Sequence, residues 1–427
     1  MMEGVTLNLL FFIAIVLLLD VYVFRGLSKL SVKWKFIGKR WFFITWVTVT
    51  TVLLGSLLLA VYVKIDLGLR LVIVLAFFGL LLFKACFALV LLVDDLRRLS
   101  IFIGRKRKKT SIETVETKQP PTPIPRSEFL LKAGLLAGAV PLAAFKLNMK
   151  SGLYDYQVKR HNLYLPNLPK AFDGMKLGQI SDIHSGSFFD KKAVLGGVEM
   201  LLGEKPDLIF FTGDLVNEQT NEMRDYQDIF SKVKAPLGVF SSLGNHDYGD
   251  YADWASPAAK QKNLDDLVQT HKNMGWDLLR NENRRLKIGN EEIGILGIEN
   301  WGELSRFPKY GRMDLAVKNT DDLPVKLLLS HDPSHWRAQV LPHYPQIDMV
   351  FAGHTHGMQF GLRTELFQWS PVEYLYNEWA GFYRESKQQI YVNVGYGFFG
   401  FRGRVGILPE ITIFTLKAGP DPLQSLS

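Results

Sequence analysis

Cysteine is nearly absent from this chain of 427 residues, which contains only Cys86. A single cysteine excludes an intrachain disulfide and a structural zinc site built from thiolates, and it leaves the redox compartment open. The chain also has no glycine-rich phosphate-binding loop, no internal repeat and no nucleic-acid-binding motif. A P-loop nucleotide hydrolase, a repeat solenoid and a DNA- or RNA-binding function are therefore excluded.

Excess charge is modest, since 50 Lys and Arg stand against 42 Asp and Glu, for a net charge of +8. The basic residues crowd beside long apolar runs, so we attribute the excess to membrane topology and to contact with anionic lipids. At 48% hydrophobic residues, the chain can hold a membrane bundle and one large globular domain.

Three almost wholly apolar windows, Leu7–Phe24, Trp41–Val63 and Leu71–Val93, lie in the first part of the chain. About 20 apolar residues suffice to cross a bilayer as a helix. The pattern predicts a transmembrane helical region over residues 1–98 with three spans. Asp20 and Lys84 interrupt these windows, and we expect their charges to snorkel to the membrane interface because no partner is evident.

Basic residues orient these helices. The positive-inside rule places the first and third connections in the cytoplasm and the amino terminus outside. The first connection carries six basic residues, and the segment after the third window carries a second group: Arg25, Lys29, Lys33, Lys35, Lys39 and Arg40, then Arg97, Arg98 and 105–109.

Residues 99–127 are basic and Pro-rich and predict an extended linker. A fourth hydrophobic segment, residues 128–148, follows. It is either a further span or a degenerate export signal: it resembles the hydrophobic part of a twin-arginine signal, but the arginine pair is missing. A crossing would place the following domain outside the cytoplasm, and a surface-bound segment would leave it inside. The basic linker favours the crossing.

Five clusters of metal-binding side chains follow short apolar, strand-like runs in the second half of the chain. The runs 176–181, 208–212, 239–243, 325–330 and 348–352 precede Asp182-Ile183-His184, Gly213-Asp214, Gly244-Asn245-His246-Asp247, His331 and Gly353-His354-Thr355-His356. This alternation predicts an α/β domain with the clusters gathered at one edge of a sheet. Imidazole, carboxylate and carboxamide groups without thiolate suit Mn, Fe, Zn, Co or Ni, whereas Ca²⁺ is disfavoured.

The order and content of these clusters resemble the calcineurin-like metallophosphoesterase superfamily, whose pattern is D-x-H, G-D, G-N-H-[DE], H and G-H-x-H. Segments 172–176, 393–397 and 408–413 resemble its membrane-associated bacterial members. The resemblance implies a four-layer αββα sandwich of two mixed β-sheets over residues 155–420. It also implies two divalent metal ions bridged by Asp214, with Asp182, His184 and His356 on one and Asn245, His331 and His354 on the other.

In this family pattern a hydroxide that bridges the metals is the nucleophile, because metal binding lowers the pKa of water from about 15.7 toward 7. His246 would face the phosphoryl group, and Asp247 would orient it and raise its pKa.

Each motif alone has a plain structural interpretation, since Gly-Asn is a turn signal and D-x-H occurs by chance. Only their joint occurrence in order carries the prediction. His335 is a candidate for substrate contact. The stretch 250–285 resembles a cap over the metals, and the aromatic stretch 360–383 either contacts lipid or sugar phosphate or packs in the ordinary way, which we favour.

The sequence therefore predicts a multi-pass protein of the bacterial inner membrane with an extracytoplasmic phosphohydrolase domain, active with manganese or a similar ion. Its substrate would be a phosphodiester or a lipid-linked phosphate or diphosphate, and its other partner the bilayer. The alternative is a noncatalytic membrane receptor or scaffold that binds a phospho-ligand. The complete ligand set argues against that alternative.

Overall fold

The structure is a computed structural model that describes residues 2–31, 39–62, 67–107, 132–136, 138–139, 152–364 and 367–422. The chain divides into two compact units, Met1–Leu147 and Asn148–Ser427. The expected linker 99–127 lies outside the described residues from residue 108 onward, and so does most of the expected fourth segment 128–148.

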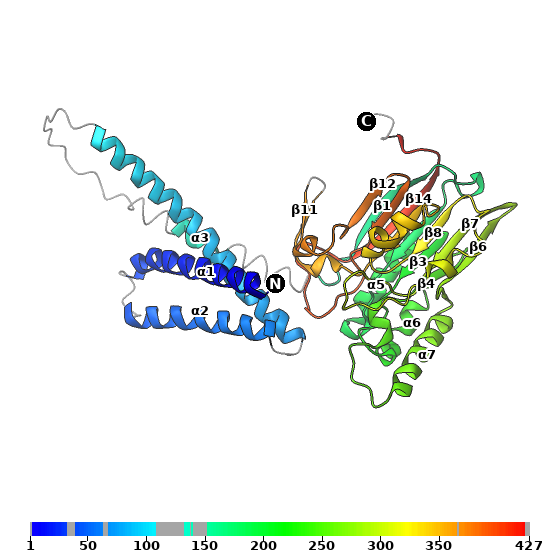
Figure 1. Cartoon of the computed structure of the whole chain (residues 1–427), viewed down its shortest axis with the longest axis horizontal. Helices are drawn as coiled ribbons and strands as arrows, with labels where there is room; N and C mark the ends of the chain where they lie inside the picture. The colour runs from blue at the N-terminus through cyan, green and yellow to red at the C-terminus, as the bar shows by residue number, and fades with distance from the viewer. Residues whose placement is uncertain are drawn as a thin grey trace. The chain divides into compact units, whose positions relative to one another are not determined.

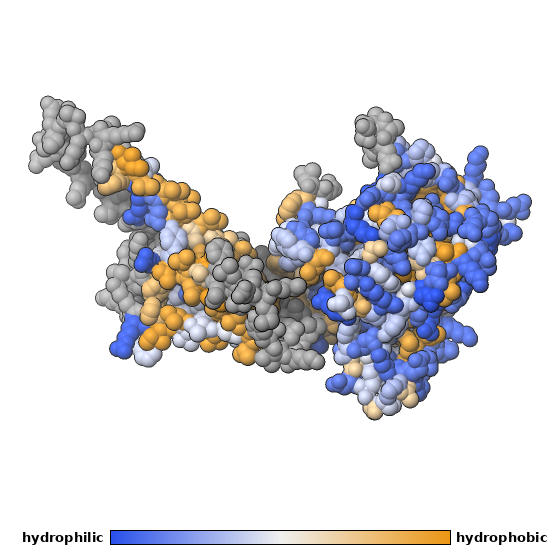
Figure 2. Space-filling view, viewed as in Figure 1, coloured by the Kyte–Doolittle hydropathy of each residue, from blue (hydrophilic) through white to orange (hydrophobic). Residues whose placement is uncertain are grey.

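Three long helices make up most of the described part of the first unit: α1 (Met2–Ser31), α2 (Lys39–Tyr62) and α3 (Leu67–Arg107) (Figure 1). Stretches Arg40–Leu59 and Ala76–Ile103 are long and apolar enough to cross a membrane. Figure 2 shows apolar side chains over these helices, whereas the visible face of the second unit is mostly hydrophilic. Helix α3 continues through residues 99–107, so the first part of the expected linker is helical.

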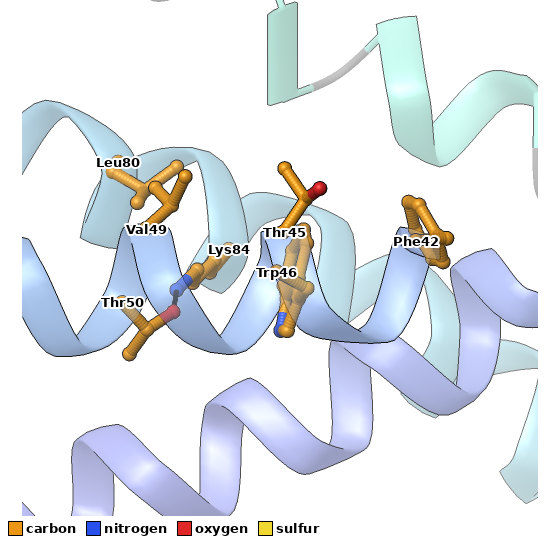
Figure 3. A pocket seen from close by; sticks show the side chains of 7 residues that line it. All are labelled: Phe42, Thr45, Trp46, Val49, Thr50, Leu80 and Lys84. Atoms are coloured by element: carbon orange, nitrogen blue, oxygen red, sulfur yellow. Dashed lines mark hydrogen bonds between the residues drawn. The ribbon is translucent and has the colours of Figure 1, made fainter. Parts of the chain in front are cut away.

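Asp20 and Lys84 are buried inside this helical unit, and the expectation that they snorkel to the interface is wrong. The Lys84 ammonium donates to the Asp20 carboxylate and, at 3.0 Å, to the Thr50 hydroxyl, which itself donates to Asp20 at 3.1 Å. The three residues come from α1, α2 and α3, so a hydrogen-bonded triad joins all three helices. Lys84 also lies 4.9 Å from the ring centroid of Trp46, beside a cavity of about 230 Å³ (Figure 3).

The second unit contains two six-stranded sheets and a separate hairpin. The first sheet has the order β1 (Gln157–Leu165), β14 (Glu410–Ala418), β2 (Lys176–Ile180), β3 (Leu208–Thr212), β4 (Val239–Ser242), β5 (Asp277–Leu278). The second has the order β12 (Gly381–Glu385), β13 (Gln388–Val392), β9 (Met349–Ala352), β8 (Lys326–Leu329), β7 (Glu291–Gly297), β6 (Glu282–Ile288). The hairpin pairs β10 (Leu362–Arg363) with β11 (Gln368–Trp369). Both large sheets mix parallel and antiparallel pairs.

Side chains along the central strands point alternately to the two faces of each sheet, and this explains why the two sheets pack against each other. In β3, Leu208 and Phe210 join a hydrophobic core shared with the second sheet, whereas Ile209 and Phe211 face the helices. In β9, Phe351 enters the shared core and Val350 faces the other way. A strand buried on both faces reads as a continuous apolar run, which is why these segments were recognisable.

Helices cover the outer face of each sheet. The first face packs against α5 (Lys191–Gly203), α6 (Gln227–Phe230) and α7 (Pro257–Met274), and the second against α8 (Met313–Ala316), the π-helical turn Trp336–Val340 and α9 (Leu341–His343). The predicted mixed-sheet αββα architecture is confirmed.

Most of the stretch 250–285 is part of this framework, although Tyr251 reaches Asn245 and His246 beside the metal ligands, as we expected of a cap. Leu267 and Met274 of α7 are buried in the core beneath the first sheet. Strand β5 then joins the first sheet, and β6 begins the second. The helical pattern indicated α7 correctly but could not show which surface the helix covers.

Candidate metal centre

All five predicted clusters lie at the carboxyl ends of β2, β3, β4, β8 and β9. Strands β2, β3 and β4 are parallel neighbours in the first sheet, and β8 and β9 are parallel neighbours in the second. The clusters of each sheet therefore emerge at one edge, and the two edges meet. Gly353 permits this approach, because a Cβ there would collide with Ser181 and Asp182.

One group of ligand atoms comes from Asp182, His184 and His356, all within 4.8 Å of one another. Nε2 of His356 lies 3.3 Å from Oδ1 of Asp182. The Asp182 carboxylate is held in place by the backbone amide of His354, which donates to both of its oxygens at 3.0 Å. The loop that follows β9 thus fixes the first carboxylate of the site.

A second group, within the same limit, comes from Asp214, His331 and His354. Nε2 of His331 lies 3.1 Å from Oδ2 of Asp214, and Nδ1 of His354 lies 2.8 Å from Oδ1 of Asn245. The other ring nitrogen of His331, Nδ1, is 2.7 Å from the Thr212 carbonyl, so it carries the proton and leaves Nε2 for a ligand.

Asp214 lies between the two groups. Its Oδ2 is 3.5 Å from Nε2 of His184 in the first group, besides its contact with His331 in the second. A carboxylate in this position can bridge two cations. The structure thus gathers six of the predicted ligand residues into two groups of three and places Asn245 against His354 of the second group.

Five of these residues have backbone conformations that are uncommon for side-chain-bearing residues, with φ between 49° and 73°: Asp182, His184, Asp214, His354 and His356. Left-handed backbone costs about 1–3 kcal/mol for such residues and tends to persist at functional sites, where the surrounding fold holds it.

The electrostatics of the site favour cation binding. Burial lowers the pKa of His184 to about 3 and that of His354 to about 4, and it also lowers the pKa of His356, so these rings are neutral at pH 7 and can act as ligands. Burial alone would lower the pKa of His331 too, but the Asp214 carboxylate outweighs it and raises that pKa. A proton on His331 thus compensates Asp214 in the metal-free site.

Two divalent cations fit these residues. The buried Nε2 of His356 has no hydrogen-bond partner among the residues that the structure describes, although it faces Asp182. A buried imidazole nitrogen without a partner is costly unless a ligand satisfies it. The donors are nitrogen and oxygen only, which matches the predicted Mn, Fe, Zn, Co or Ni.

His246 lies beside this centre, but Asp247 has partners other than those expected. Nδ1 of His246 donates to the Asn217 carbonyl at 2.6 Å, which leaves Nε2 for a substrate. The Asp247 carboxylate instead accepts backbone amides of Asp214 and Gly244, at 2.9 and 2.8 Å, and of Leu215 and Val216. Burial lowers the pKa of His246, opposed by Asp214. Asp247 therefore positions the Asp214 loop, and Asn217 orients His246.

His335 departs from the expected substrate contact. Its ring is buried, with Nδ1 2.9 Å from Ser330 Oγ and Nε2 2.7 Å from Gln339 Oε1. The tight turn after β8 folds the side chain inward, so both nitrogens are occupied. His335 supports the loop that carries His331.

The sequence placed Tyr251 in the expected cap and Tyr376 in the aromatic stretch, but it did not indicate Phe399 or a buried arginine at the site. The Tyr251 hydroxyl accepts from Asn245 Nδ2 at 3.0 Å, the Tyr376 hydroxyl lies 2.8 Å from His354 Nε2, and the Phe399 ring packs at a tilt against that of His246, with centroids 4.3 Å apart. Arg404 is fully buried, donates to the Gly397 carbonyl and lies 3.2 Å from Nδ1 of His356. The Gly- and Phe-rich run around Phe399 is the only pattern in the sequence that points to this part of the site. Nothing in that run indicates that its side chains face the metal ligands.

A loop held by backbone and side-chain hydrogen bonds places the exposed Arg306 at the rim of the site. Residues Trp301 and Lys309 form an antiparallel bridge, and the buried Asn300 donates to the Pro308 carbonyl at 3.1 Å. The Phe307 ring packs edge-on against that of His354, with centroids 4.6 Å apart, and the exposed Arg306 guanidinium lies 4.6 Å from the Phe307 centroid. Burial and then Asp332 raise the pKa of Tyr376, and Arg306 opposes this shift because it lies close by.

A two-sheet α/β fold with histidine and carboxylate side chains at the strand ends, and with Asp214 between two groups of them, is typical of metal-dependent hydrolases. Residues 175–358 match the family model "Calcineurin-like phosphoesterase", and residues 6–153 match "Probable Calcineurin-like phosphoesterase, transmembrane domain". The chain belongs to the calcineurin-like metallophosphoesterases and carries an N-terminal transmembrane domain. Enzymes of this family use two divalent metal ions.

Relatives occur in eukaryotes and bacteria. A Danio rerio transmembrane protein with a metallophosphoesterase domain is 29% identical over 58% of this chain and 55% of its own length, so the match spans about half of that protein. An uncharacterised metallophosphoesterase of Bacillus subtilis is 29% identical over 61% of this chain and 86% of its own. Another, from Campylobacter jejuni, is 25% identical over 63% and 66%.

Proposed function

We propose that this protein is a membrane-anchored binuclear phosphohydrolase that cleaves a phosphodiester or a lipid-linked phosphate or diphosphate. The observation that carries the proposal is the position of Asp214 between two groups of buried ligands. Manganese is the ion that we propose among those that suit these donors.

We assign the residues of the site two roles, metal binding and contact with the phosphoryl group. When bound, two divalent cations supply Lewis-acid contact to phosphate oxygens and a water of lowered pKa. Asp182, His184 and His356 hold one position, and Asn245, His331 and His354 hold the other. Nε2 of His246 faces the phosphoryl group and hydrogen-bonds its oxygens or the leaving oxygen.

The rim of the site supports a substrate larger than a phosphomonoester. Tyr251, Phe307, Tyr376 and Phe399 surround the ligands with aromatic surface, and Arg306 is an exposed cation beside them. A guanidinium is suited to bidentate contact with a second phosphate. We therefore favour a diphosphate or a diester with an apolar group over a small monoester.

For localisation, we propose a multi-pass protein of the bacterial inner membrane with an extracytoplasmic catalytic domain. The support is the transmembrane domain and the basic residues around its helices. Protease added to spheroplasts should digest the catalytic domain, and digestion only after lysis would place it in the cytoplasm.

The function is tested with the purified full chain loaded with Mn²⁺ and bis(p-nitrophenyl) phosphate. We expect hydrolysis by the wild type, its loss in Asp214→Asn, and normal rates in Asp225→Asn, which alters an exposed carboxylate paired with Lys191. Equal activity of Asp214→Asn and wild type would refute the site. Tight phospho-ligand binding without turnover would favour a receptor or scaffold.

A further inference from the structure

The segment after His356 forms a small lobe that we define as residues 358–376 and name the hairpin lobe. It contains the β10–β11 hairpin, which is separate from both main sheets (Figure 1), and the 3₁₀-helix Pro371–Tyr374. The Gly361 amide donates to the Val405 carbonyl at 2.9 Å, and Ser370 Oγ donates to the Gly357 carbonyl at 2.8 Å. The lobe is thus fastened to the catalytic unit.

Its outer surface is apolar. Five of the eleven exposed large hydrophobic side chains described in residues 152–422 lie in this lobe: Met358, Leu362, Phe367, Tyr374 and Leu375. Tyr374 is 76% exposed, and Phe367 is 57% exposed. Thr364 is the other exposed residue among those described in the lobe, and it carries no charge. Scattered exposed apolar residues are ordinary, but a concentrated patch marks an interaction surface.

The inner side of the same lobe reaches the metal centre. Tyr376 directly follows the exposed Leu375 in the sequence, and its hydroxyl lies 2.8 Å from Nε2 of His354. The Thr355 hydroxyl, between two ligands, donates at 2.7 Å to the carbonyl of Trp379, just beyond the lobe. One short element therefore links a surface whose exposed described side chains are uncharged to the metal ligands.

We infer that the hairpin lobe rests in the interfacial layer of the bilayer, so that a lipid-borne phosphoester reaches the metals without leaving the membrane. The occupant is a bilayer because a transmembrane domain in the same chain keeps the catalytic unit beside one. Tyr and other amphipathic aromatics with aliphatic neighbours are the composition favoured at that interface. The delivery of substrate rests on the proposed function, whereas the location of the lobe does not.

The location is tested without any activity. In a Cys86→Ser background, Tyr374→Cys carries a fluorophore, and the full chain is reconstituted in phosphatidylcholine nanodiscs. We expect brominated lipid to quench this label at least twofold more than a label at Tyr310→Cys, an exposed aromatic outside the lobe. Equal quenching at the two positions overturns the inference. A label shielded from aqueous iodide but not quenched by lipid also overturns it, since a protein would then cover the patch.

Delivery is tested with two substrates that share a leaving group. The double variant Tyr374→Ser, Leu375→Ser should hydrolyse hexadecyl p-nitrophenyl phosphate in phosphatidylcholine vesicles about tenfold more slowly, and soluble bis(p-nitrophenyl) phosphate at the wild-type rate. Leu315→Ser, an exposed leucine elsewhere, is the matched control. Equal losses on both substrates, or none, overturn delivery by the lobe. A wild type inactive on both substrates counts against the proposed function and leaves the quenching result standing.

Discussion

The carboxylate of Asp247 accepts the backbone amide of Asp214 at 2.9 Å. Its other contacts are also with backbone amides, those of Gly244, Leu215 and Val216. A side chain adjacent to His246 in sequence thus positions the loop that presents the Asp214 carboxylate. This separates two residues that sequence alone groups as a catalytic pair.

Replacement of Asp247 and of His246 should therefore give different defects. Asp247→Asn turns one acceptor into a donor that faces backbone N–H groups, and we expect a loss of about 1–3 kcal/mol in the free energy of unfolding together with loss of metal. His246→Asn should keep metal but lower turnover by about 10²–10⁴-fold. Metal analysis, thermal unfolding and kcat measured on both variants check this. Full metal content in Asp247→Asn would contradict the role of its carboxylate.

Arg306 should discriminate substrates by their second phosphate. Because its guanidinium lies at the rim beside Phe307, Arg306→Ala should lower kcat/KM on a diphosphate diester by about 10- to 100-fold, the loss of a charge-assisted contact worth about 1.5–3 kcal/mol. Its rate on bis(p-nitrophenyl) phosphate should change little. Arg312→Ala, which removes an exposed arginine paired with Asp314, serves as the control. A uniform loss on both substrates would argue against a second phosphate.

Metal affinity should rise with pH because His331 must lose a proton to bind. Asp214, against the effect of burial, raises the pKa of His331 above its ordinary value of 6.5, so the metal-free site keeps this proton at pH 7. Mn²⁺ affinity should increase by about tenfold per pH unit while one proton is displaced. Calorimetry in buffers of different ionisation enthalpy measures the release, with His343→Gln, an exposed histidine, as control.

The raised pKa of His331 also determines how the stability of the metal-free protein changes with pH. A raised pKa contributes stability that is fully present below the unfolded pKa of about 6.5 and is lost as pH rises through the folded pKa. The metal-free protein should therefore lose this contribution above neutral pH, and loading with Mn²⁺ should restore stability there. An affinity independent of pH between 6 and 8 would show that His331 is neutral before metal binds.

Much of the centre was predictable because its strands are buried on both faces and end at ligands. Runs such as Leu208–Thr212 stand out from hydropathy alone, and their parallel order brings their ends together. Side-chain direction was not predictable in the same way. Adjacency of His246 and Asp247 does not show that they face different partners, and the pattern of α7 gives a helix without the surface it covers. Hydropathy also does not show which faces of three apolar helices meet. The sequence therefore did not indicate that Asp20 is the partner of Lys84.

The triad of Asp20, Thr50 and Lys84 should hold the three helices together. Lys84→Met leaves the Asp20 carboxylate buried without its cation, which should cost about 3–5 kcal/mol in stability. The double variant Asp20→Leu, Lys84→Met removes both charges and should recover most of that loss, because apolar replacement of a buried pair is often neutral. Thermal unfolding in detergent, followed through Trp46 beside the ammonium, compares the three proteins. If Lys84→Met is as stable as the wild type, the ion pair does not stabilise the bundle.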